Sequence, residues 1–66
     1  MSRPISIKLV LGVLRKKGFF FVSQKGSHAK FRKGDLMVIV PLHGKELPAG
    51  TFRSILRQSK LSEDDF

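Results

Sequence analysis

The sequence predicts an α+β fold, and three observations support that prediction. A helical period of apolar residues opens the chain, three short runs rich in aromatic and β-branched residues follow it, and a second helical period comes after them. Glycine-containing turns separate the apolar runs, which favours antiparallel pairing of neighbouring strands. The order is therefore α-β-β-β-α, a three-stranded antiparallel sheet with two helices on one face. With a length of 66 residues and no repeat or linker, residues 1–66 are predicted to form one small domain.

The first helix is predicted over residues 5–17. Its apolar positions recur at i, i+3, i+4 and i+7 on one face: Ile7, Val10, Leu11 and Leu14. Pro4 suits the start of this helix and Gly18 suits its end. Further apolar side chains widen the surface beyond one stripe: Ile5, Leu9 and Val13. They either pack against the sheet or are covered by a partner protein, and the sequence leaves both interpretations open.

Three strands are predicted over residues 19–24, 28–33 and 36–41. The turns between them are Lys25-Gly26-Ser27 and Gly34-Asp35. Side chains alternate between the two faces of a strand. In the first strand, one face is predicted to carry Phe19, Phe21 and Ser23, and the other face Phe20, Val22 and Gln24. In the second it separates core positions from exposed ones: Ala29 and Phe31 against His28, Lys30 and Arg32. In the third it separates Leu36, Val38 and Val40 from Met37 and Ile39.

The last third of the chain is predicted to hold a polar loop over residues 42–47 and a second helix that opens at Pro48 or Ala49. Its buried positions recur at helical spacing: Phe52, Ile55 and Leu56. The segment from Ser62 resembles a helix start, with a capping serine followed by acids. Since the chain stops at Phe66, we expect this tail to fray.

Composition narrows the possible functions. The formal net charge is +8, from 13 lysines and arginines against 5 acids, which suits a nucleic acid, an anionic membrane surface or an acidic protein. The longest apolar run is far too short to span a bilayer, so a membrane protein is not expected. The absence of cysteine and of a visible secretory signal indicates the cytoplasm. The 2 histidines and 5 acids form no cluster of ligand types, so neither a metal site nor a cofactor is expected.

Residues 24–31 carry the clearest chemical signal. An imidazole can both take and give a proton near neutral pH, and His28 stands in this segment between Lys25 and Lys30. Gly26 permits close approach of a ligand, and the backbone N–H groups of Gly26 and Ser27 could bind an anion. A proton-transfer group beside cations is the minimum equipment for cleaving RNA without a metal. The alternative is that His28 is an ordinary exposed strand residue.

Other polar residues allow two interpretations each. Lys45, Arg53 and Arg57 form either a ridge of phosphate contacts or an ordinary solvated surface. His43 is either a second proton-transfer group or a loop residue bonded to the backbone at Gly44. The acids cluster in the C-terminal tail, so the rest of the chain lacks the clustered carboxylates that a paired-carboxylate or two-metal nuclease would need.

Several motifs follow one another in a recognisable order and spacing: Gly18-Phe19, residues 24–28 (Gln-Lys-Gly-Ser-His), Phe31, residues 39–41 (Ile-Val-Pro), His43, residues 44–48 (Gly-Lys-Glu-Leu-Pro) and residues 50–58 (Gly-Thr-Phe-Arg-Ser-Ile-Leu-Arg-Gln). Together they resemble the HicA toxins of bacterial and archaeal toxin–antitoxin pairs, also called the YcfA-like family. The resemblance implies a fold like that of double-stranded-RNA-binding domains and ribonuclease activity on mRNA. It also implies His28 as the catalytic histidine and neutralisation by a HicB-like antitoxin.

Two other functions fit the same composition. A non-catalytic module that binds double-stranded RNA would bind duplexes with steep salt dependence and leave them intact. An adaptor that binds an acidic protein would have no affinity for RNA at moderate salt. The expected RNA contacts for the ribonuclease interpretation are Lys25, Gly26, Ser27, Lys30, Lys45 and Arg53.

Overall fold

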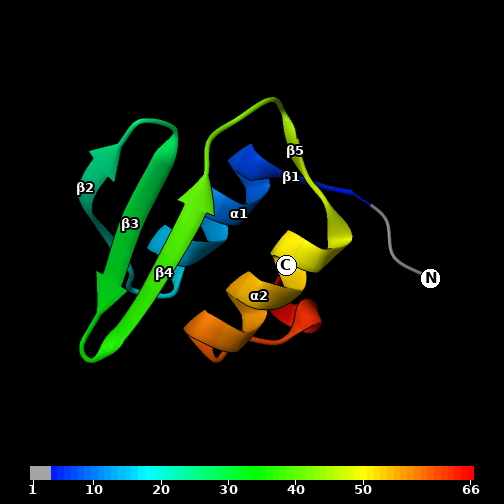
Figure 1. Ribbon diagram of the computed structural model, residues 1–66. Coiled ribbons are helices and arrows are strands. Elements are labelled where there is room, and N and C mark those ends of the chain that lie inside the picture. The colour runs from blue at the N-terminus through cyan, green and yellow to red at the C-terminus, as the bar shows by residue number, and fades with distance from the viewer. Residues whose placement is uncertain (1–3) are drawn as a thin grey trace.

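The computed structural model describes residues 4–66. The elements follow in this order: β1 (Ile5–Ser6), α1 (Ile7–Lys16), β2 (Phe20–Lys25), β3 (His28–Lys33), β4 (Leu36–Pro41), β5 (Glu46–Leu47), α2 (Ala49–Ser59) and a 3-10 turn, η1 (Glu63–Asp65). Strands β2, β3 and β4 form an antiparallel sheet in that order, with α1 behind it and α2 beside β4 (Figure 1). The predicted α+β fold is confirmed, including its likeness to a double-stranded-RNA-binding domain.

The start of the first helix differs from the sequence prediction. Ile5 pairs with Leu47 as part of the small β1–β5 sheet, so the predicted helix start at residue 5 and the predicted loop over 42–47 are both wrong there. The side chain of Ser6 then accepts the backbone N–H of Leu9 at 3.3 Å, which caps the first turn of α1. A pairing of two residues with partners 40 and 42 positions away leaves no periodic signal in the sequence, so the sequence did not predict it.

The sheet departs from simple alternation at one place in β2. A bulge between Phe21 and Ser23 leaves Val22 without a cross-strand partner. Beyond the bulge the two faces exchange, so Gln24 pairs with the buried Ala29 rather than sharing a face with Phe20. The predicted alternation of this strand is therefore wrong after Phe21. The bounds of β3 and β4 are confirmed, and β2 begins and ends one residue later than predicted.

The core lies between the sheet and the two helices. It contains Ile7, Val10 and Leu14 from α1, Phe19, then Ala29, Phe31, Val38 and Val40 from the sheet, and Leu47, Phe52 and Ile55. These include most of the positions that the helical and strand periods predicted, with Leu11 and Leu56 half-buried at the margin. Of the extra apolar residues that the sequence assigned to the first helix, Ile5 lies in β1 and packs against this core, whereas Leu9 remains 44% exposed.

Helix α2 closes the free edge of β4 with a side chain. The backbone N–H of Ile39 donates to Oε1 of Gln58 at 2.9 Å, and Nε2 of Gln58 donates to Ser54 at 3.1 Å. This contact covers part of the β4 edge that no strand pairs with, which hinders non-specific pairing with a strand of another molecule.

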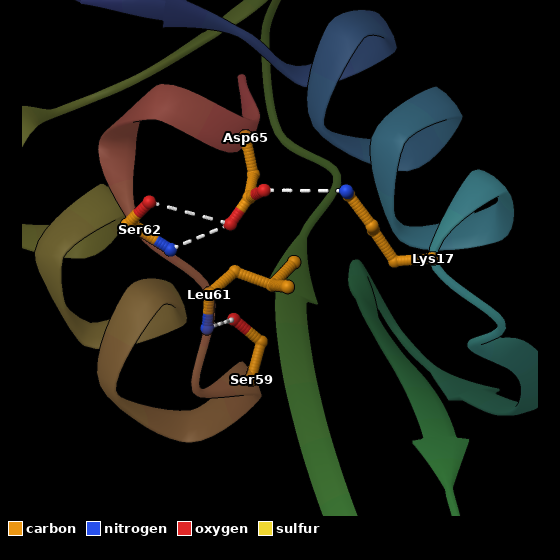
Figure 2. A network of polar contacts seen from close by, with 5 residues as sticks. All are labelled: Lys17, Ser59, Leu61, Ser62 and Asp65. Atoms are coloured by element: carbon orange, nitrogen blue, oxygen red, sulfur yellow. Dashed lines mark hydrogen bonds and ion pairs between the residues drawn. The ribbon is translucent and has the colours of Figure 1, made fainter.

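The C-terminal tail is held in place, contrary to the expectation that it frays. Asp65 accepts the backbone N–H of Ser62 at 2.9 Å and lies 3.2 Å from the ammonium of Lys17, as Figure 2 shows. The ring of Phe66 meets Phe52 edge-on, with centroids 5.1 Å apart. The Ser62 N–H and then the Lys17 ammonium lower the pKa of Asp65 below its ordinary value. The predicted capping serine is confirmed, because Ser62 and Asp65 form a reciprocal capping box.

Candidate functional site

The β2–β3 hairpin positions His28 at the first residue of β3. His28 lies opposite Lys25 on one side and Pro41 on the other. The intervening two-residue turn has Gly26 at φ +59 and Ser27 at negative φ, the pattern of a type II′ hairpin turn. Glycine occupies its first central position because other residues rarely adopt that backbone conformation.

Hydrogen bonds hold this turn on two sides. The side-chain amide of Gln24 donates to the carbonyl of Gly26 at 3.0 Å. The backbone N–H of Leu42 donates to the carbonyl of Ser27, so the segment that leaves β4 is tied to the turn. The position of the His28 backbone is therefore fixed by its own hairpin and by the neighbouring strand.

One face of the sheet is covered by the helices, and His28 lies on the other. Residues directly opposite each other in an antiparallel sheet share a face. The register therefore gives the outer face three cross-strand rows: Lys25, His28 and Pro41; Ser23, Lys30 and Ile39; and Phe20, Arg32 and Met37. On the inner face, Ala29 and Phe31 are buried, as predicted. His28 and Arg32 are exposed and Lys30 is half-buried, so imidazole and cations share one surface.

The bulge at Val22 determines which β2 residues reach this surface. In a regular strand, Lys25 would lie on the opposite face from Phe20. With one extra residue inserted, both Phe20 and Lys25 lie on the face of His28. The sequence prediction therefore missed Phe20 as a member of the outer face that carries Lys25, because no residue pattern marks a bulge.

The predicted site residues fall into two groups. The hairpin brings together Lys25, Gly26, Ser27, His28 and Lys30. Lys45 lies at the end of the loop after β4, where its carbonyl accepts the N–H of Ile7 at 3.0 Å and its side chain is exposed. Arg53 is exposed on α2 and is not part of the outer sheet face.

Arg53 instead lines a cleft of about 520 Å³ between the start of α1 and helix α2. Its walls include Leu9, Phe52, Glu63 and Phe66. His28 does not line this cleft, so the cleft and the candidate chemistry are separate places. His43 is exposed and lies in the same loop as Leu42, whose N–H bonds the turn.

Comparison with protein families decides what kind of chain this is. A family model described as the HicA toxin of bacterial toxin–antitoxin matches residues 7–61. The chain belongs to the HicA toxin family. The match spans α1 to the end of α2 and includes every predicted site residue of this HicA toxin. A search of curated proteins finds no match.

Membership makes this HicA chain the toxin component of a toxin–antitoxin pair, and the resemblance seen in the sequence is confirmed. Within residues 4–66, no helix combines the length and apolar character needed to cross a bilayer.

Proposed function

We propose that this HicA toxin is an endoribonuclease that cleaves mRNA with His28 as its general acid or base. The observation that carries the proposal is the position of His28, exposed on the uncovered face of the sheet beside Lys25 and one row from Lys30. An imidazole with cations on an open surface can meet a phosphodiester without any rearrangement of the core.

RNA supplies the nucleophile for the reaction. The 2′-hydroxyl loses its proton to a base, its oxygen forms a bond to the adjacent phosphorus, and the bond to the 5′-oxygen breaks as that oxygen takes a proton. His28 either accepts the first proton or donates the second. General acid–base assistance of this kind typically contributes about 10²–10⁴-fold to the rate.

Positive charge supplies a second contribution. The phosphorane-like transition state carries extra negative charge on the non-bridging oxygens. Lys25 and Lys30 flank His28 in the register of the sheet and would stabilise that charge. No metal ion or cofactor takes part in this proposed route, because the nucleophile, the proton-transfer group and the cations all come from RNA and this chain.

We also propose that a HicB-like antitoxin neutralises the toxin by covering its basic surface. The family supports an antitoxin partner, and the net charge of +8 favours a partner with acidic character. A covered outer face would block His28 and exclude RNA at the same time.

The test is digestion of a single-stranded transcript by the purified protein in EDTA. We expect the His28→Ala variant to cleave at least about 100-fold more slowly than the wild type, since it lacks the proton-transfer group. A His43→Ala variant tests the other histidine: cleavage at the wild-type rate would make His43 a loop residue, and a loss as large as that of His28→Ala would make it the second proton-transfer group. Equal cleavage by the wild type and His28→Ala would overturn the assignment of His28. Binding of duplex RNA without cleavage by either protein would favour the non-catalytic binding module.

A further inference from the structure

We infer that the uncovered face of the β2–β3–β4 sheet binds single-stranded RNA along β3, from His28 at one end to Phe20 and Arg32 at the other, with Phe20 as the platform on which a base stacks. This inference rests on the proposed function, because it takes RNA as the ligand. It assigns a binding role to two residues outside the hairpin turn, and it names the strandedness of the RNA.

Phe20 is one of two exposed phenylalanines in β2. It is 58% exposed and lies opposite Arg32 in the row farthest from His28. Exposure of one apolar side chain is ordinary on a protein surface, and what distinguishes Phe20 is the face that it shares with His28 and the cations. The register places this ring on the side of the sheet that no helix covers, where a base could reach it.

Every residue of β2 is exposed, so the neighbouring Phe21 serves as a comparison for the face on which a ring lies rather than for its exposure. Phe21 is also exposed, at 54%, but it pairs with the buried Phe31 and lies on the inner side of the sheet. Its ring meets Phe31 edge-on with centroids 5.9 Å apart. Two adjacent phenylalanines of similar exposure therefore lie on opposite faces, and only Phe20 shares a face with His28.

Cations connect the two ends of the proposed track. From His28 to Arg32 is four residues of β3, about 13 Å at the usual rise of a strand, and Lys30 lies between them. The nine residues that form the three outer rows include no carboxylate. The Nε of Arg32 donates to the carbonyl of Gly34 at 3.0 Å, which fixes the guanidinium while its terminal nitrogens remain available for a phosphate.

Single-stranded RNA fits this surface better than a duplex. A base can stack on Phe20 only after it has left its own stack, as bases do on the sheets and grooves that bind single strands. The proposed chemistry also needs the 2′-hydroxyl, the phosphorus and the leaving oxygen to come into line. A-form duplex geometry holds that hydroxyl away from such alignment, whereas a flexible single strand can adopt it.

The test measures RNA binding in the absence of cleavage. All variants are made in the His28→Ala background, and fluorescence anisotropy reports binding of a labelled single-stranded oligoribonucleotide and of a hairpin duplex. We expect Phe20→Ala to weaken single-strand binding by about 5- to 100-fold, the loss typical of one stacked base. Phe20→Trp should restore it, and Phe20→Leu should not, because leucine is apolar without a flat π-face.

Phe21→Ala is the matched control, expected to change single-strand affinity less than about twofold. Thermal unfolding of each variant shows that it is folded at the temperature of the binding assay. Equal losses from Phe20→Ala and Phe21→Ala, or a duplex bound as tightly as the single strand, would overturn the inference. Because binding is measured without His28, a failure of His28 as the catalytic group leaves this result unchanged, so the two proposals fail separately.

Discussion

At the scale of single residues, two glycines with open surroundings have opposite effects on stability. Gly26 in the hairpin turn has φ +59, whereas Gly12 lies inside helix α1. A Cβ added at either position would meet no atom within 4 Å. Since neither substitution causes a clash, any change in the free energy of unfolding must come from backbone preference.

We therefore expect opposite signs from one substitution at these positions. Gly26→Ala should lower the free energy of unfolding by about 1–2 kcal/mol, the cost of left-handed backbone for alanine. Gly12→Ala should raise it by about 0.5–1 kcal/mol, because alanine is the better helix former. Urea denaturation of the two variants measures both values. A Gly26→Ala variant as stable as the wild type would mean that the turn in solution differs from the one described.

At the scale of elements, sequence periods predicted what local patterns can specify. The buried stripe of α1, the bounds of β3 and β4, and the outward position of His28 all follow from spacing of 3.6 or 2 residues. The β1–β5 pair and the bulge at Val22 could not be predicted, because each depends on contacts with a distant segment or on one unpaired residue. The same limitation applies to Phe20, whose place beside Arg32 is a property of register rather than of composition.

The tail illustrates a second reason for a wrong prediction. A short acidic segment at a chain end is expected to fray, and its own sequence gives no sign of a partner. In the structure, Asp65 of η1 forms an ion pair with Lys17, the residue that follows the last turn of α1 (Figure 2). An ion pair between segments 48 residues apart, together with the Phe52–Phe66 contact, orders the terminus.

The contacts of Asp65, with the Ser62 N–H first and the Lys17 ammonium second, make the stability of the domain depend on pH at the acidic end. Because the pKa of Asp65 is lowered in the folded state, the unfolded chain binds more protons there as the pH falls, and folding stability decreases. The contribution is fully present above the ordinary pKa of an aspartate and is lost below about pH 4. We expect the difference in unfolding free energy between wild type and Asp65→Asn to shrink as the pH falls through this range.

Urea denaturation at several pH values between about 3 and 7 checks this expectation. Asp64→Asn is the matched control, since Asp64 is an exposed neighbour in the same 3-10 turn. A difference between wild type and Asp65→Asn that stays constant over the whole pH range would show that neither the Ser62 N–H nor the Lys17 ammonium stabilises the ionised Asp65.

At the scale of the whole molecule, the arrangement separates stability from binding. The helices, the inner sheet face and the tail form one core on one side of the sheet, and α2 closes the edge of β4 through Gln58. The outer face takes no part in that core, so residues on it can contact a ligand, and can differ between sequences, without disturbing the packing of the core. Small domains have little surplus stability, and a division of this kind lets the binding surface vary without weakening the fold.

The salt dependence of RNA binding tells this local surface apart from a general attraction to the net charge. Three cations lie on the outer face, Lys25, Lys30 and Arg32, although the formal net charge is +8. For single strands the logarithm of affinity falls with the logarithm of salt concentration by about 0.7 for each phosphate neutralised. Binding along the outer face should therefore give a slope of about −2, measured with the His28→Ala protein.

Arg32→Gln should flatten that slope by about 0.7, whereas Arg57→Gln on the exposed side of α2 should leave it unchanged. A slope near −6, or equal effects of both arginine substitutions, would show that RNA is attracted to the molecule as a whole rather than to the uncovered sheet.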